Sequence, residues 1–328
     1  MAHKTIAITG STGFVGRAMV QSLLQAGHHV RALARSRDKA RDVLPNDTRV
    51  TLVLGDASNP ADANELVRGS DAIINLVGII REDRRKGQTF QRAHVDIARI
   101  LVGACEQLGC KRFLQMSAMN VSDVGVSEYQ QSKWDAEAAI RFSSLQWTMM
   151  RPGLIHGPDG DFIKMAQAWC KGDIPPYFFL PYFTGGKPDY RVPLGGIEPR
   201  VGRVAPIAVE DVCSAFVAAI SNEATYGEVY NLAGPETMTW PEMLRTIRDN
   251  TPGAHKFVPF GIPAEPVAIV AQAADLLGLG GLLPFDAGMA RMGAQDSIAD
   301  TTKARIDFGF KPRPFTKSYA QYAAALAH

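Results

Sequence analysis

Tyr129 and Lys133 have the side chains and the spacing of an acid–base pair, within the segment Tyr-Gln-Gln-Ser-Lys. Residues four apart share one face of a helix, and Ala136 and Ile140 continue that face, which predicts that the pair points inward. A phenol has a pKa near ~10, and a nearby ammonium stabilises the phenolate and brings that pKa toward neutrality. Ser117, at the end of an expected strand, is placed to bind a substrate oxygen. This pattern predicts proton transfer at that oxygen.

Three glycines with the spacing Gly-x-x-Gly-x-x-Gly lie between an expected strand over residues 6–9 and an expected helix. The first glycine permits a tight turn, the second lets backbone N–H groups approach a pyrophosphate, and the third lets the helix pack on the strand. The helix N-terminus adds partial positive charge. The sequence therefore predicts a dinucleotide site made by Gly10, Ser11, Thr12, Gly13, Phe14, Val15 and Gly16.

The end of the second expected strand favours NADP(H) over NAD(H). An NAD-preferring site usually has an acid there to bind the ribose 2′-hydroxyl, whereas this strand ends in Arg35, followed by Ser36, Arg37 and Lys39. A guanidinium can bind a 2′-phosphate with two hydrogen bonds. The alternative is that these cations only solvate the surface and the start of a helix.

These residues need a scaffold that brings strand ends together. The expected strands are apolar throughout rather than alternating, which is typical of parallel strands buried on both faces, and helical patterns of 3.6-residue period separate them. Strand and helix in this rhythm predict an α/β fold with a doubly wound parallel sheet of the Rossmann type. The expected strands are residues 6–9, 29–34, 50–54, 72–77, 112–116, 147–150 and 228–232.

The regular succession of expected strands and helices is interrupted in two stretches, which we assign to a smaller mixed C-terminal substrate lobe. Residues 175–203 and 235–328 are expected to form that lobe, and residues 1–174 with 204–234 the NADP(H)-binding domain. The apolar segment 175–183 within the lobe is open to three interpretations: a lid, a docking surface for protein or membrane, or ordinary packing.

Composition narrows the possible functions. The chain has 328 residues, 46% hydrophobic and 21% charged, with a net charge of +2, which gives no case for nucleic acid. Its four cysteines form no CxxC pair and no metal site is expected. No leader or transmembrane segment is visible, which together with reduced cysteines predicts a cytoplasmic protein.

Several segments together resemble the extended and atypical short-chain dehydrogenase/reductase families. The likeness is strongest to the branch that contains the dehydrogenase-like accessory subunit of respiratory complex I and its bacterial relatives. The segments that carry it are the glycine loop, Asn75–Ile80, Met116–Met119, Tyr129–Lys133, Arg151–Gly157, Pro206–Val212 and Asp307–Phe310.

The resemblance implies further cofactor contacts. Asp56, beside Ala57, would accept a hydrogen bond from the adenine amino group, although it could instead cap the helix that begins near Pro60. The backbone of Leu76, Val77 and Gly78 would pass the adenine ribose, Lys133 would hold the nicotinamide ribose, and Pro152 would lie against the nicotinamide.

Two departures from the extended families shift the likeness toward the atypical group. His94 stands where many members have an asparagine, and Ser117 precedes Tyr129 by fewer residues than is usual.

Two classes of function follow. The first is an NADP(H)-dependent oxidoreductase or isomerase acting on a small carbonyl or alcohol through Ser117, Tyr129 and Lys133. The second is a non-catalytic NADPH-binding scaffold or accessory subunit of a respiratory complex, which would then lie peripheral to the inner membrane and have a protein partner.

Overall fold

A seven-stranded parallel sheet forms the centre of the computed structural model, which describes residues 3–189, 196–279, 281 and 283–323. The strand order is β12-β6-β5-β4-β1-β2-β3, and every neighbouring pair is parallel. The doubly wound parallel sheet predicted from the sequence is confirmed. Its strands are β1 (Thr5–Thr9), β2 (His29–Ala34), β3 (Val50–Leu54), β4 (Ala72–Asn75), β5 (Arg112–Met116), β6 (Gln146–Pro152) and β12 (Glu228–Leu232).

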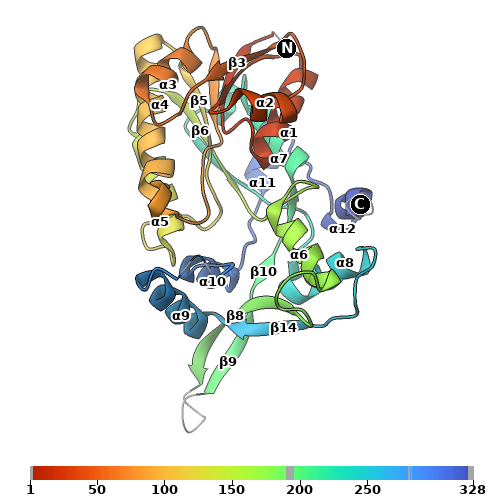
Figure 1. Ribbon diagram of the computed structural model, residues 1–328. Coiled ribbons are helices and arrows are strands. Elements are labelled where there is room, and N and C mark those ends of the chain that lie inside the picture. The colour runs from red at the N-terminus through yellow and green to blue at the C-terminus, as the bar shows by residue number, and fades with distance from the viewer. Residues whose placement is uncertain (1–2, 190–195, 280, 282, 324–328) are drawn as a thin grey trace.

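Helices cover both faces of this sheet (Figure 1). Because successive strand residues point to opposite faces, Ile6 and Ile8 of β1 enter one core, while Ala7 enters the other. The first core lies under α1 (Phe14–Gln25) and α7 (Val209–Ala219). The second lies under α3 (Pro60–Val67), α4 (Ile97–Leu108) and α5 (Glu128–Arg141), and the short α2 (Arg37–Val43) lies between β2 and β3 in the chain.

Three local expectations were wrong. Strand β3 is not buried on both faces, because it is the edge of the sheet, and Leu54 is 44% exposed. Strand β4 ends at Asn75 rather than Val77. The helix after β4 begins as a π-helical stretch, Gln91–Asp96, before it becomes α4.

The smaller lobe contains a mixed sheet, as expected, below the carboxyl edge of the main sheet (Figure 1). Strand β8 (Leu180–Asp189) pairs parallel with β14 (Pro259–Pro263) and antiparallel with β9 (Gly196–Val201). Two short strand pairs lie outside both of these sheets: β7 (Ile155–His156) with β11 (Ile207–Ala208), and β10 (Arg203–Val204) with β13 (Met238–Thr239).

The helices of this lobe form two groups. Helices α6 (Asp161–Lys171), α8 (Trp240–Asp249) and α12 (Phe315–Ala323) share one apolar core, and α9 (Ala264–Leu276) packs on α10 (Ala287–Gly293).

The domain limits at residues 174, 203 and 234 stay a prediction. Helix α6, which precedes the first limit, packs on α8 and β8, while α11 (Thr302–Phe308), after the last, packs on α7 and β12.

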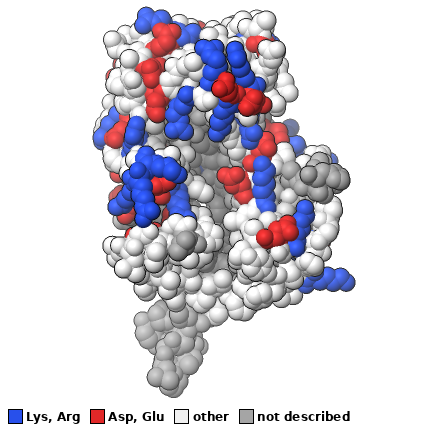
Figure 2. All heavy atoms as spheres, in the orientation of Figure 1, with Lys and Arg blue, Asp and Glu red and all other residues white. Residues whose placement is uncertain are grey.

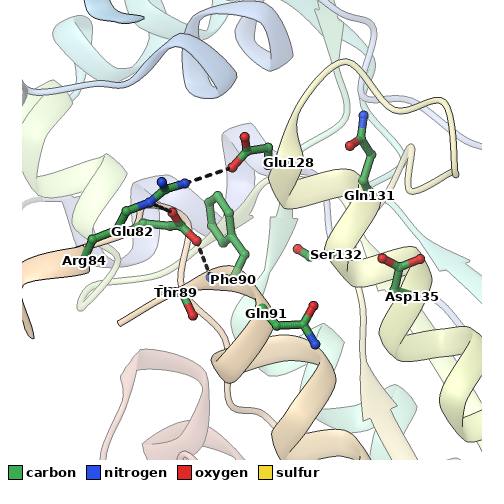
Figure 3. Close-up of a pocket in the computed structure, with 9 residues that line it drawn as sticks. All are labelled: Glu82, Arg84, Thr89, Phe90, Gln91, Glu128, Gln131, Ser132 and Asp135. Carbon is green, nitrogen blue, oxygen red and sulfur yellow. Dashed lines mark hydrogen bonds and ion pairs between the residues drawn. The ribbon is translucent and has the colours of Figure 1, made fainter. Parts of the chain in front are cut away.

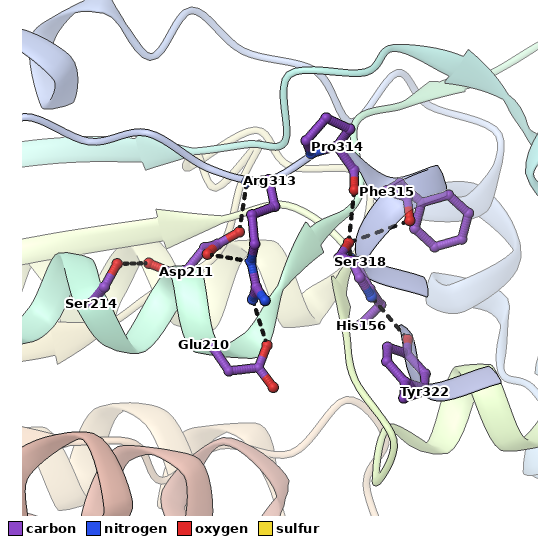
Figure 4. Close-up of polar contacts among 9 residues, drawn as sticks. All are labelled: His156, Glu210, Asp211, Ser214, Arg313, Pro314, Phe315, Ser318 and Tyr322. Carbon is purple, nitrogen blue, oxygen red and sulfur yellow. Dashed lines mark hydrogen bonds and ion pairs between the residues drawn. The ribbon is translucent and has the colours of Figure 1, made fainter. Parts of the chain in front are cut away.

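Polar contacts fix the last described helix to the main domain (Figure 4). The Nδ1 atom of buried His156 lies 2.9 Å from the hydroxyl of Tyr322, and Ser318 lies 3.3 Å from Nε2. Arg313 donates to Asp211 and Glu210 at the start of α7. No helix within the described ranges is long and apolar enough to cross a membrane.

Candidate functional site

The glycine loop has the geometry of an anion cradle. Gly10 has a φ of +69°, and a Cβ there would lie 3.1 Å from the carbonyl carbon of Leu76. A Cβ on Gly16 would lie 2.0 Å from the Gly10 oxygen, so only glycine lets the helix pack this closely. Helix α1 begins at Phe14, and its N-cap, Gly13, has no side chain to accept from the first turn. The backbone N–H groups of the first turn of α1 are therefore available to bind an anion.

The other loop residues have different roles. The Ser11 hydroxyl donates to the Leu33 carbonyl at 2.8 Å and is buried, so it fixes the loop to the end of β2. Thr12 is partly exposed, and Val15 packs at the margin of the first core. The predicted contacts of this loop with a cofactor thus depend on its backbone more than on these side chains.

A second loop, over residues 153–160, covers the glycine loop, which the sequence did not predict. A Cβ added to Gly157 would lie 2.9 Å from the Phe14 ring, and one on Gly160 would lie 3.3 Å from it. Arg17 pairs with Asp159 at 3.2 Å. The glycines at 157 and 160 were the available signal, because both leave room for the ring.

Arg35 and Asp56 lie at the ends of β2 and β3. Arg35 is exposed. Burial opposes ionisation of Asp56, but hydrogen bonds from Ser58 and the charges of Arg35 and Arg92 outweigh it, so its pKa lies below the usual value. Asp56 does not cap α3, as one alternative had it, because Asn59 is the cap. Arg92 is a cation of this region that the sequence analysis did not identify.

The segment after β4 passes close to both the glycine loop and α5. The Leu76 N–H donates to the Thr9 hydroxyl at 3.3 Å, and the Val77 N–H donates to the Asn75 side chain at 3.2 Å. A Cβ on Gly78 would lie 2.9 Å from the Nζ atom of Lys133. Glycine at 78 therefore makes room for the lysine. Ala57 is buried in the second core.

Lys133 is a buried cation with unused donors. Helix α5 begins after Ser127, whose side chain accepts from the Gln130 N–H. The Lys133 side chain is buried, and its Nζ atom donates to the Met116 carbonyl at 3.2 Å. An ammonium has three protons, and within the described part of the chain this carbonyl is its one hydrogen-bond acceptor. The remaining donors fit the hydroxyls of a nicotinamide ribose.

Tyr129 lies on the same helix, partly exposed, with its ring edge against His94 and Phe90. Burial raises the pKa of Tyr129 to about 12 and lowers that of Lys133 to about 8, the latter opposed by the charge of Glu137. The expected lowering of the phenol pKa by Lys133 is therefore wrong for the chain alone. The reason is that burial disfavours the charged form of both groups. In this state Tyr129 holds its proton and can donate it.

His94 connects the cofactor side of the site to α5. Its Nε2 atom lies 3.2 Å from the backbone nitrogen and 3.1 Å from the carbonyl oxygen of Ile79, and its Nδ1 atom lies 2.8 Å from the Ser132 hydroxyl. Ser132 in turn donates to the Tyr129 carbonyl at 3.0 Å. Burial, followed by the charge of Lys133, lowers the pKa of His94 to about 2, so the ring is neutral. This residue clamps the helix of Tyr129 to the loop at Gly78.

The Ser117 hydroxyl is hydrogen-bonded to a buried cluster of charged side chains. It donates to Glu137 at 2.6 Å. Glu137 is 1% exposed and also accepts two hydrogen bonds from Arg151, at 2.7 and 2.6 Å, and one from Arg141 at 3.1 Å. The substrate contact expected of Ser117 stays a prediction. Pro152, the last residue of β6, is buried one residue beyond Arg151.

A polar pocket lies beside α5 (Figure 3). It reaches Ser132 and Phe90, but its lining includes neither Tyr129 nor Lys133. Glu82 of this pocket accepts from the Phe90 N–H at 2.7 Å and thereby fixes the start of the π-helical stretch. We therefore regard it as the outer side of the site. The lining residues are Glu82, Arg84, Thr89, Phe90, Gln91, Glu128, Gln131, Ser132 and Asp135.

Comparison with known proteins agrees with this geometry. Residues 10–168 match the NAD(P)H-binding family. A ceramide reductase of Caulobacter vibrioides is 28% identical over 245 residues, which are 74% of this chain and 69% of that protein. The mitochondrial NADH dehydrogenase [ubiquinone] 1 alpha subcomplex subunit 9 of Arabidopsis thaliana is 28% identical over 247 residues, 74% of this chain and 56% of the subunit. This chain thus matches little more than half of that subunit's length.

A solved structure shows the same fold. The NADPH-dependent quinone oxidoreductase QOR2 of Escherichia coli, complexed with NADPH, has a TM-score of 0.69 and 18% identity, covering 96% of this chain and 99% of that one. At this identity the likeness establishes the architecture and leaves the substrate open.

Proposed function

We propose that this chain, whose residues 10–168 match the NAD(P)H-binding family, is an NADPH-dependent reductase of a carbonyl compound. The observation that carries the proposal is the placement of Tyr129 and Lys133. They share one helix beside Gly78, and the Lys133 Nζ atom has donors to spare. The dinucleotide would extend from the glycine loop along the strand ends to this pair.

The chain's own residues account for the proton side of the reaction. Reduced nicotinamide, when bound, supplies a hydride to the carbonyl carbon. Tyr129 donates its proton to the carbonyl oxygen, giving an alcohol, and its partial exposure lets solvent restore that proton. Lys133 holds the ribose through its unused donors. His94 keeps Tyr129 in register with the loop at Gly78 through Ser132.

Preference for NADPH rests on Arg35. It ends the second strand with no acid beside it in the sequence, and its charge, with that of Arg92, acts on Asp56. The pair of arginines favours a 2′-phosphate at this end of the site.

The test is NADPH oxidation with a panel of quinones, aldehydes and ketones. Tyr129→Phe removes one hydroxyl and should lower turnover about a hundredfold, the scale for losing a general acid. NADPH affinity should stay within a few-fold, because the phosphate contacts lie elsewhere. Tyr226→Phe, at a tyrosine whose ring packs against Arg112 rather than in the site, is the matched control and should behave as the unmodified protein. Full turnover in Tyr129→Phe would remove Tyr129 from the mechanism.

The second candidate is a structural NADPH-binding subunit of a larger assembly. It is favoured by the likeness to the mitochondrial subunit and by the Ser117 hydroxyl, which Glu137 already engages. Tight NADPH binding without turnover of any substrate in the panel would support this function over the reductase.

A further inference from the structure

Helix α9 of the smaller lobe buries small residues and exposes several of its large apolar ones. Its buried residues are all alanines, Ala264, Ala268 and Ala271. Val267 packs at the margin of this core, but four other large apolar side chains at α9 and its C-cap are exposed. Their exposed fractions are 61% for Ile269, 62% for Val270, 89% for Leu276 and 74% for Leu277. A surface helix normally buries its large apolar residues, so this helix has a second face that the described chain does not cover.

These side chains form one continuous strip, which we call the α9 stripe. Ile269 and Leu276 lie seven residues apart, which is two helical turns, and Val270 and Leu277 run beside them. Leu279, just after the helix, extends the strip and is 50% exposed. The nearby Glu265 is paired with Arg291 on α10, and the pKa of Arg84 is raised by Glu82 and also by the charge of Asp275, which is exposed beside Leu276. An apolar strip of this kind marks an interaction site.

A basic segment adjoins the end of the stripe. Residues 81–86 contain four cations and two acids. Arg85 donates to the Gly278 carbonyl at 3.0 Å, which joins this segment to the chain just after α9. The side chains of Arg84 and Lys86 are 74% and 73% exposed and pair with Glu82 at 2.7 Å and Asp83 at 2.9 Å. Ion pairs this exposed contribute little to stability, so both cations can exchange these partners for headgroup phosphates. Figure 2 shows Lys and Arg, with Asp and Glu among them, above a mostly uncharged surface where Figure 1 places α9.

We propose that the α9 stripe docks the protein on an anionic lipid bilayer. A helix lying at a bilayer surface buries aliphatic side chains at the acyl boundary, while neighbouring Lys and Arg bind the headgroups. The stripe fits this partner because it is wholly aliphatic. Cores of protein interfaces are enriched in aromatic residues, methionine and arginine, and the stripe has none of these.

The stripe is connected to the site through α10. A Cβ on Gly288 of α10 would lie 3.0 Å from the Cβ of Ser127, at the start of α5, and Gln130 donates to Gln295 at 3.0 Å. Docking would therefore bring the mouth of the site next to the bilayer. This step rests on the proposed function: a site that opens beside the bilayer would take a carbonyl substrate dissolved in the membrane.

Vesicle binding tests the proposal without any reference to turnover. The full chain is sedimented with vesicles of phosphatidylcholine alone and with vesicles that also contain phosphatidylglycerol, and it should bind the anionic vesicles more tightly. The double variant Leu276→Gln/Leu277→Gln should weaken binding about a hundredfold, since each buried leucine is worth roughly tenfold. The matched control, Phe142→Gln/Ile306→Gln, changes side chains that are 92% and 73% exposed elsewhere and should bind normally.

Charge and self-association complete the test. Arg85→Glu should weaken binding to anionic vesicles about tenfold and leave binding to phosphatidylcholine unchanged. No binding of the unmodified chain, or equal binding of the leucine variant, would overturn the proposal. A dimer that the leucine variant converts to monomer, without vesicle binding, would assign the stripe to a second copy and likewise overturn it. Turnover lost with vesicle binding intact would count against the proposed function alone.

Discussion

Replacing Glu137 with glutamine should cost stability, because this carboxylate is the centre of a buried charge cluster. It is 1% exposed and accepts hydrogen bonds from Ser117, Arg141 and Arg151. Removing one partner of a buried ion pair costs about 3–5 kcal/mol. Glutamine keeps one acceptor oxygen, and Arg141 and Arg151 are 36% and 18% exposed, so water can hydrate both. We therefore expect the free energy of unfolding to fall by about 2–3 kcal/mol.

Urea unfolding at neutral pH measures this loss, with Glu106→Gln as control. Glu106 is exposed and accepts from Ser144, so its replacement should change stability little. The hydrogen bonds to Glu137 lower its pKa against the opposing effect of burial. Its contribution is therefore complete above its unfolded pKa and is lost as the pH falls through the folded one. Equal urea midpoints for Glu137→Gln and the unmodified chain would refute the reasoning.

The remaining predictions concern the cofactor. NADPH affinity, measured by calorimetry, should fall as the pH rises through about 8, because Lys133 then loses its charge; Lys133→Met should bind more weakly and lack this dependence, and an identical pH profile would remove the lysine from the ribose site. Gly13→Val should abolish NADPH binding while the circular dichroism spectrum is kept, because its side chain would fill the space for the pyrophosphate; unchanged affinity would place the phosphates elsewhere. Arg35→Asp should weaken NADPH about ten- to a hundredfold and spare NADH, and equal affinities of the unmodified chain for both cofactors would contradict it.

Local sequence predicted the parts of the fold that depend on local chemistry. The limits of β2 and β5 were predicted correctly, because their apolar runs end at charged or turn-forming residues. The glycine loop was also found, since a positive φ at Gly10 and close packing at Gly16 leave few alternatives. These features are visible in a single short segment.

The rest depends on contacts between distant segments. The parallel pairing of β8 with β14 joins segments whose sequences carry no mutual signal. The exposure of Leu54 follows from the position of β3 at the sheet edge, which its own residues do not encode. The bond from Ser117 to Glu137 was missed for the same reason: the sequence shows two polar residues, and the fold makes them partners.

The position of β12 at the edge of the main sheet has a consequence for synthesis on the ribosome. This strand, Glu228–Leu232, pairs with β6, Gln146–Pro152, although strands β8 and β9 of the smaller lobe lie between them in the chain. Until β12 has emerged, β6 is an open edge with unpaired backbone groups, and open edges promote aggregation. Nascent chains that stall before residue 228 therefore expose this edge and become clients for chaperones, whereas chains stalled after residue 232 can close the sheet.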